Sequence, residues 1–280
     1  MPVVVVSDSS SRLTLDEREQ WNIRQVPLHV LVDGADLRDG VDDIPYDIHD
    51  RAKVSTAGAT PAELVDTYRQ ALDDSGGDGV VAVHLSAALS STYTAAVTAA
   101  REFGAPVRVV NSRSAAMGVG FVALAAARSA AAGADLDAVE EAARAARIRT
   151  HVYLVVHRLD NLRRSGRIRT TASWLGTALS LKPLLCLDID GRLVLDQRIR
   201  TVTKAHAAMV ERVAEAVGER SADVVVHHVD NHDAADELGA TLTQRLPQLS
   251  SLTVADMGPL LSVHVGAGAV GVAVQVEAHR

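Results

Sequence analysis

The chain has 280 residues, of which 48% are hydrophobic and 22% charged, and its formal net charge is −7. This composition is that of a folded globular protein, and it excludes intrinsic disorder and a general nucleic-acid-binding surface. No basic segment precedes the first apolar run, no apolar stretch is long enough to span a membrane, and the single cysteine, Cys186, leaves no internal disulfide. We therefore expect a soluble cytoplasmic protein without a membrane span.

Valine-rich runs alternate with helical patterns through the first half of the chain. Buried strands are predicted at residues 3–6, 26–32, 79–85 and 106–110. Helices are predicted at residues 60–72, 90–104, 115–133 and 135–149. The first of these helices has Thr60 as its N-cap, followed by Pro61 and by Glu63, which completes a capping box. The alternation predicts an α/β domain over residues 1–150, with an open, mostly parallel sheet and helices on both faces.

The pattern changes near residue 150. A strand at 151–157 and a helix–turn–helix at 159–181 precede a hairpin at 182–200, whose tight turn contains Asp190 and Gly191. A long amphipathic helix follows, marked by Val202, Met209, Val213 and Val217. The remaining strands are predicted at 222–229, 251–257 and 268–276. We expect a second α/β domain over residues 151–280 with a mixed or antiparallel sheet.

Polar residues gather where strands of the first domain end. The strands are followed by SDSSS, SAALSSTY and NSRS, and the loop STAGAT precedes the capped helix. Because the carboxyl ends of parallel strands meet at one edge of a sheet, these hydroxyls, with Asp8 and Asn111, are expected to form one rim. Hydroxyls and helix N-termini together suit an anion. The alternative is that they only cap helices and fill turns.

A glycine-rich segment late in the sequence has the spacing of a dinucleotide-binding turn. Gly266, Gly268 and Gly271 match Gly-x-Gly-x-x-Gly, but only nine residues follow Gly271, too few for the second strand and the acidic ribose ligand. A similar string at 118–123 lies inside a predicted helix. Neither segment is therefore expected to bind a nucleotide.

Other candidate chemistry is weak. The chain has no Gly-x-Ser-x-Gly elbow, and Cys186 and His84 lie in apolar strands, where a buried structural role is expected. A possible metal-binding cluster comprises His227, His228, His232, Asp230 and Asp233. Alternation along a strand sends His227 and His228 to opposite faces, so no metal site is expected.

Six segments in order carry a family resemblance: VVSDSSSRL, VPLHVLVDG, VSTAGATPAEL, HLSAALSSTYTAA, LDNLRRSGRI with LSLKPLL, and HVGAGAVG. From end to end the chain resembles the DegV family, bacterial fatty-acid-binding proteins that serve as acyl-carrying subunits of fatty acid kinase. The resemblance implies a two-domain α/β fold in which the first domain provides a headgroup-binding rim and the second closes over the acyl site. The tail would lie in an apolar tunnel, and an aromatic content of only 3% suits an alkyl ligand.

The resemblance also implies roles for particular residues. Those implied to hold the fatty-acid carboxylate are Ser55, Thr56, Ser86, Ser90 and His264. Supporting turns are implied at Asp8, Gly266 and Gly268. A surface facing the kinase, or a merely solvated loop, is implied at Arg163, Arg164 and Arg167. Four positions depart from the family pattern: Ala57-Gly58 replaces Gln-Pro, which predicts a more flexible loop, and Ser91, Ser165 and Ala267 replace Gly, Gly and Pro.

The implied function is a carrier without catalysis or cofactor of its own. It would present a long-chain fatty acid to a separate fatty acid kinase with a dihydroxyacetone-kinase-like domain, which makes the acyl phosphate, and it would bind no nucleic acid and touch membranes only transiently. One alternative is a small hydrolase or phosphotransfer enzyme that uses the serine-rich rim, with His264 as base and a carboxylate such as Asp8 to orient it. Another is a metal-binding regulator that uses the histidine cluster.

Overall fold

The computed structural model describes residues 2–168 and 181–278. Within this part of the chain the contacts define two compact units. Unit 1 comprises the chain up to Ile44 together with Thr56–Thr150, and unit 2 comprises Pro45–Ser55 together with the chain from His151. The sequence pattern had suggested a change near residue 150 but gave no sign that Pro45–Ser55 packs with the second part. Ile48, in a short 3-10 helix packed against α9 (Pro259–Val265), is fully buried there.

Unit 1 is built on a four-stranded parallel sheet with the order β2-β1-β6-β7. Its strands are β1 (Val4–Asp8), β2 (Ile23–Val26), β6 (Val80–His84) and β7 (Val107–Asn111). Every residue of β1 and β6 is buried, because both central strands are covered on two faces. This burial explains the valine runs without alternation and confirms the predicted parallel sheet.

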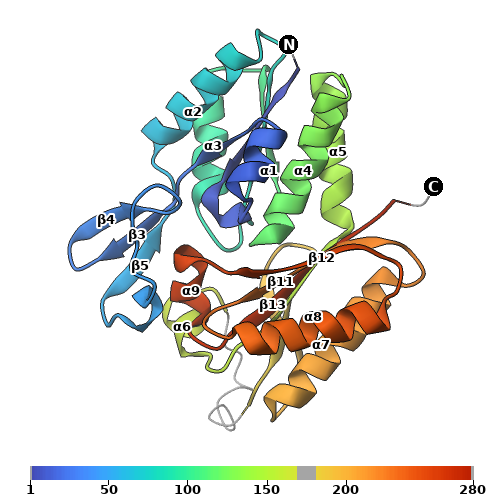
Figure 1. Ribbon diagram of the computed structural model, residues 1–280. Helices are drawn as coiled ribbons and strands as arrows, with labels where there is room; N and C mark the ends of the chain where they lie inside the picture. Colours follow the sequence, from blue (N-terminus) through green and yellow to red (C-terminus); the bar gives the residue numbers. More distant parts are fainter. Residues whose placement is uncertain (1, 169–180, 279–280) are drawn as a thin grey trace. The chain divides into compact units, whose positions relative to one another are not determined.

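Helices cover both faces of this sheet, as predicted. α2 (Pro61–Asp74) and α3 (Thr92–Ala100) pack together on one face, and α4 (Met117–Ala131) and α5 (Leu136–Ile148) on the other (Figure 1). A short helix, α1 (Leu15–Gln20), contacts β2. α2 begins with the predicted capping box, in which the Thr60 hydroxyl accepts a hydrogen bond from the Glu63 N–H at 3.3 Å.

One predicted strand is wrong. Residues 26–32 are not continuous, because Pro27 has no N–H for a ladder and interrupts the run. β2 ends at Val26, and β3 (His29–Val32) belongs to a separate three-stranded sheet with the order β4-β3-β5. In this sheet β4 (Ala35–Arg38) forms an antiparallel hairpin with β3, and the third strand is β5 (Val54–Ala57). The hairpin turn, Asp33-Gly34, has positive φ at both residues, which is the turn that Asp-Gly favours.

Unit 2 contains a mixed six-stranded sheet with the order β10-β9-β8-β13-β11-β12. Its strands are β8 (Thr150–Val155), β9 (Leu184–Leu187), β10 (Leu193–Gln197), β11 (Ala222–His228), β12 (Leu249–Asp256) and β13 (Val270–Val276). β9 and β10 form the predicted hairpin, and β11 pairs parallel with β12 but antiparallel with β13. The mixed sheet predicted from the sequence is confirmed.

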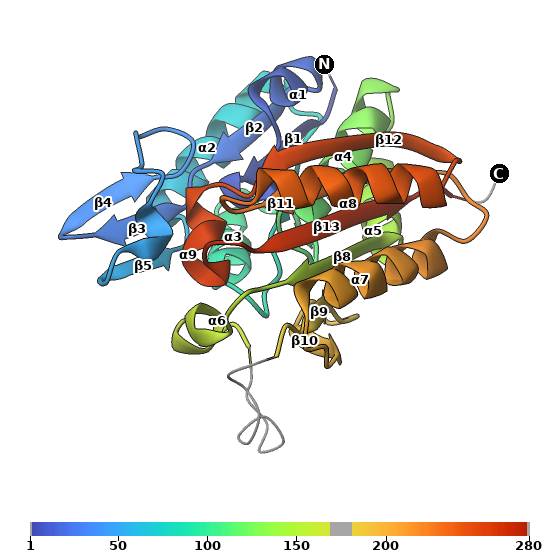
Figure 2. The same ribbon diagram turned by 60° about the horizontal axis from the view of Figure 1, so that its bottom comes forward.

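Two helices, α7 (Val202–Val217) and α8 (His232–Arg245), pack side by side against this sheet (Figure 2). Alternation along β8 sends Tyr153 and Val155 into the core beneath these helices. Leu154 of β8, and Val156 just after the strand, enter a second core beside α9 and α6 (Asp160–Arg164), whose buried members are all aliphatic or methionine. The second helix predicted within 159–181 falls mostly outside the described residues.

Candidate functional site

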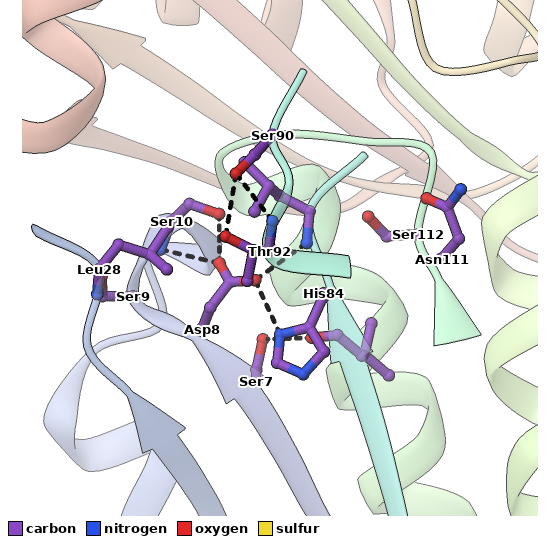
Figure 3. Close-up of polar contacts among 12 residues, drawn as sticks. Ser7, Asp8, Ser9, Ser10, Leu28, His84, Ser90, Thr92, Asn111 and Ser112 are labelled. Carbon is purple, nitrogen blue, oxygen red and sulfur yellow. Dashed lines mark hydrogen bonds and ion pairs between the residues drawn. The ribbon is translucent and has the colours of Figure 1, made fainter. Parts of the chain in front are cut away.

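The carboxyl ends of β1 and β6 are joined by one fully buried carboxylate, that of Asp8. It accepts hydrogen bonds from the backbone N–H and the hydroxyl of Ser10 and from the Leu85 N–H at 3.0 Å (Figure 3). Its Oδ2 also lies 3.0 Å from Nδ1 of His84. These bonds neutralise the cost of burying a charge and fix the turn after β1 against the end of β6.

The hydrogen bonds continue from His84 into α2. Nε2 of His84 lies 2.8 Å from the hydroxyl of Tyr68, and both side chains are fully buried. In the neutral tautomer Nδ1–H donates to Asp8 and Nε2 accepts from the tyrosine. Burial, together with the charge of Asp8, raises the pKa of Tyr68, which keeps its hydroxyl protonated. His84 is thus the buried, hydrogen-bonded histidine that its apolar strand predicted, whereas no pattern in the sequence linked it to Asp8.

The loops after β6 and β7 are also joined. The Ser86 N–H donates to the carbonyl of Ser114 at 2.9 Å, and Oδ1 of Asn111 accepts from the N–H groups of Ala87 and Arg113 at 3.3 and 3.0 Å. With the Asp8 contacts, these bonds bring the segments after β1, β6 and β7 to one edge of the sheet. Three of the four segments predicted to form the rim therefore lie together at this edge.

Most of its hydroxyls serve the rim itself. The hydroxyl of Ser7 donates to the Val83 carbonyl, and those of Ser9 and Ser112 accept from nearby N–H groups. For these buried serines the turn-filling alternative is correct. Ser90 differs because it is only partly buried: its Oγ lies 2.9 Å from Oγ1 of Thr92 and accepts the Thr92 N–H at the start of α3 (Figure 3).

The loop between β5 and α2 approaches the same helix start. A Cβ added to Gly58 would lie 2.7 Å from Oγ1 of Thr92, so the absence of a side chain at Gly58 permits this close approach. Within β5, Ser55 is exposed and Thr56 half-buried. Neighbouring strand residues point to opposite faces, so one of these two hydroxyls, rather than both, faces any given ligand.

His264 occupies the last turn of α9 in unit 2. Burial, with the nearby guanidinium of Arg167, lowers its pKa from 6.5 to about 4. At neutral pH its imidazole is therefore uncharged and able both to donate and to accept. A negative charge brought near this ring would favour the protonated form and raise its pKa.

Comparisons with known proteins agree along the whole chain. A family model described as an uncharacterised protein of the DegV family matches residues 2–277. A DegV domain-containing protein of Mycobacterium tuberculosis is 62% identical over 278 residues, 99% of each chain. The chain belongs to the DegV family.

Two solved DegV structures have the same fold. The DegV-family protein of Thermus thermophilus, which binds fatty acid, is 30% identical with a TM-score of 0.92. The match covers 99% of this chain and 100% of that chain. DegV of Bacillus subtilis, a fatty-acid-binding protein, is 25% identical with a TM-score of 0.87 over 99% of this chain and 100% of that chain.

The DegV-like glycines after His264 form a turn and not a nucleotide site. They follow helix α9 and lead into strand β13, the reverse of the strand-to-helix order that binds dinucleotides. Gly266 and Gly268 have φ of +76° and +78°, and a Cβ at Gly268 would collide with the ring of His157. Both positions therefore require glycine, as the predicted turn does.

The three arginines implied to face a partner of this DegV protein differ in exposure. Arg164 is exposed and donates to Oδ1 of Asn161 at 2.8 Å, whereas Arg163 and Arg167 are partly buried. Burial lowers the pKa of Arg167. Their role toward a partner stays a prediction.

The histidine cluster has different contacts from those of a metal centre. The rings of His228 and His232 meet edge to face at 5.2 Å, and Nδ1 of His232 lies 2.9 Å from Asp236. In residues 2–168 and 181–278, no three histidine, cysteine, aspartate or glutamate side chains are placed to hold a metal ion.

Cys186 is partly buried, and burial raises the pKa of its thiol. No helix in this same part of the chain is long and apolar enough to cross a membrane.

Proposed function

We propose that this DegV-family protein is a non-catalytic carrier that binds one long-chain fatty acid. The observation that carries the proposal is the match, over almost the full length of both chains, to a fatty-acid-binding DegV protein at 30% identity. The chemistry of the rim supports it, because hydroxyls beside a helix start suit a carboxylate. The proposed carboxylate ligands are Ser86, Ser90, His264 and one hydroxyl of Ser55 and Thr56.

The energetics favour a ligand with a long aliphatic tail. Each buried methylene contributes about 0.8 kcal/mol, so roughly fourteen give ~11 kcal/mol before the costs of ordering and association. A carboxylate contributes little net affinity but must receive hydrogen bonds when it leaves water. The tail thus drives binding, and the hydroxyls determine which end of the fatty acid they hold.

We also propose that the bound carboxylate is presented in the cytoplasm to a separate fatty acid kinase, with Arg163, Arg164 and Arg167 as the surface that meets it. The competing enzyme hypothesis needs a carboxylate to orient His264 and names Asp8 as an example. Its carboxylate oxygens instead accept bonds from Ser10 and Leu85 and contact His84. This arrangement argues against Asp8 in that role.

Organic extraction of the purified, never-delipidated protein, followed by mass spectrometry, tests the carrier function. The expected result is about one fatty acid per chain. An empty extract from folded protein that also fails to take up added palmitate would contradict the proposal.

The headgroup assignment is tested by paired variants in β5. Because Ser55 and Thr56 lie on opposite faces, either Ser55→Ala or Thr56→Val is expected to speed palmitate release, and the other variant serves as the control. Loss of one hydrogen bond to a charged group corresponds to about a tenfold or larger change in retention. Equal effects of both variants, or none, would show that this strand does not hold the carboxylate.

A further inference from the structure

A buried histidine outside the rim lies between two carboxylates. His29, in β3, places Nδ1 2.6 Å from Oδ1 of Asp36 in β4 and Nε2 2.9 Å from Oε2 of Glu63 in α2. The His29 side chain is only 7% exposed, whereas those of Asp36 and Glu63 are 59% and 26% exposed. The ring therefore ties the β3–β4 hairpin to the first turn of α2.

The contact with Glu63 reaches the loop that precedes α2. Oε2 of Glu63 also accepts hydrogen bonds from the N–H and the hydroxyl of Thr60, at 2.8 and 2.7 Å. One carboxylate oxygen thus joins His29 to Thr60, the last residue of the loop of residues 55–60, which here includes the end of β5 with Ser55 and Thr56. The start of that loop is β5, a strand of the same small sheet as β3. The strand that carries His29 therefore supports the loop at both ends.

We propose that His29 and Glu63 are positioning residues for the loop of residues 55–60, and that loss of the His29 proton loosens this loop and releases the bound fatty acid faster. The link to fatty acid release rests on the proposed function, whereas the link to loop order does not. A neutral imidazole has a single N–H, so it cannot donate to Asp36 and Glu63 together. Deprotonation must therefore break one of the two bonds.

The charges around His29 set the direction of this dependence. Burial alone would lower its pKa, but the hydrogen bonds and charges of Glu63 and Asp36 outweigh burial and raise the pKa above 6.5. Arg38 and Asp42, paired with each other at 3.0 Å, also interact with the charges of this cluster. Both hydrogen bonds of His29 are therefore present below pH 6.5, and one of them is lost as the pH rises through the raised pKa.

Unit 1 contains a matched control for the capping box. Thr14 and Glu17 form the same motif at the start of α1, with bonds of 2.8, 2.9 and 3.2 Å. Among the contacts of the described residues, Glu17 has no histidine partner like that of Glu63. Glu→Gln preserves a capping box, so Glu17→Gln and Glu63→Gln differ mainly in the bond to His29.

The test measures palmitate release from the full chain between pH 6 and pH 9. In the wild-type protein and Glu17→Gln, release is expected to accelerate about three- to tenfold across this range, as for loss of one hydrogen bond. His29→Gln and Glu63→Gln should release palmitate at the faster rate at pH 6 already, and the pH dependence in His29→Gln should be flat. A His29→Gln profile that follows the wild type would overturn the proposal.

Amide hydrogen exchange of residues 56–60 provides a readout that needs no ligand. Exchange should quicken with pH beyond the intrinsic rate in the wild type, and should be fast throughout in His29→Gln. If the wild type retains no palmitate, the proposed function fails while this exchange still decides the positioning role. Protection that is equal in both proteins overturns that role.

Discussion

Each of the two units contains a histidine beside a charged group, and the two charges are opposite in sign. His84 in unit 1 is fully buried between the carboxylate of Asp8 and the hydroxyl of Tyr68. His264 in unit 2 is partly buried, and its charged neighbour is the guanidinium of Arg167. Unit 1 supplies its own donors to the Asp8 carboxylate, from Ser10, Leu85 and His84, so this network is complete without a ligand. The end of α9 has a cation beside a neutral imidazole, which is the setting that an anionic ligand would stabilise.

The largest effect is expected when the carboxylate in unit 1 is neutralised. Asp8→Asn turns one acceptor oxygen into an N–H₂ group that faces the N–H of Leu85 or the ring of His84. Loss of several buried hydrogen bonds to one carboxylate costs about 3–5 kcal/mol of unfolding free energy, which urea denaturation at pH 7 would measure.

The control for this variant is Asp74→Asn. Asp74 forms a shorter ion pair, 2.6 Å from Arg24, but both side chains are more than 40% exposed. Its loss should cost less than about 1 kcal/mol. Similar losses in the two variants would show that the Asp8 network does not hold the rim together.

A smaller effect is expected from His264, and it depends on pH. Its pKa of about 4 in the folded protein lies below the ordinary 6.5, so the unfolded chain binds its proton more readily. The contribution of this histidine is therefore complete above pH 6.5 and is lost as the pH falls toward 4. Allowing for its partial exposure, the wild type should lose about 2 kcal/mol relative to His264→Gln between pH 7 and pH 4.

Comparing the pH-dependent stability of the wild type with that of His264→Gln separates the contribution of His264 from those of three other histidines. Burial also lowers the pKa values of His151, His157 and His206, and these contributions cancel in the comparison. Addition of palmitate should raise the pKa of His264 as measured by NMR. Parallel stability curves for wild type and variant would contradict the inferred environment of the ring.

The sequence predicted the elements better than it predicted the contacts between them. Valine runs and the Thr60–Glu63 capping box are local signals, and they located β1, β6 and α2 correctly. The prediction of one strand at 26–32 was wrong because it gave the apolar residues more weight than Pro27. The Asp33-Gly34 hairpin signal, which would have corrected the prediction, lies just after this segment.

The candidate site shows the same limit at longer range. Parallel strand ends predicted that Asp8 and Ser86 would share one edge. The partner of Asp8 could not be identified in this way, because His84 lies 76 residues away and no spacing rule joins them. Likewise, the segment STAGAT did not indicate a strand, in which neighbouring side chains alternate, so it did not predict that Ser55 and Thr56 point to opposite faces. Residue type predicts chemistry, but the backbone decides which group reaches the ligand.

The smallest effect is expected at the far end of the Asp8 network. Tyr68→Phe removes the hydroxyl that donates to Nε2 of His84 and leaves that buried nitrogen without its donor, at a cost of about 1 kcal/mol. Asp8 keeps its bonds to Ser10 and Leu85, so palmitate retention should change little. Tyr46→Phe, at a tyrosine that is 80% exposed, is the control and should leave the urea midpoint unchanged. If Tyr68→Phe lowers the urea midpoint as much as Asp8→Asn does, the rim depends on the whole network rather than on the carboxylate, and the self-contained network of unit 1 has to include the tyrosine.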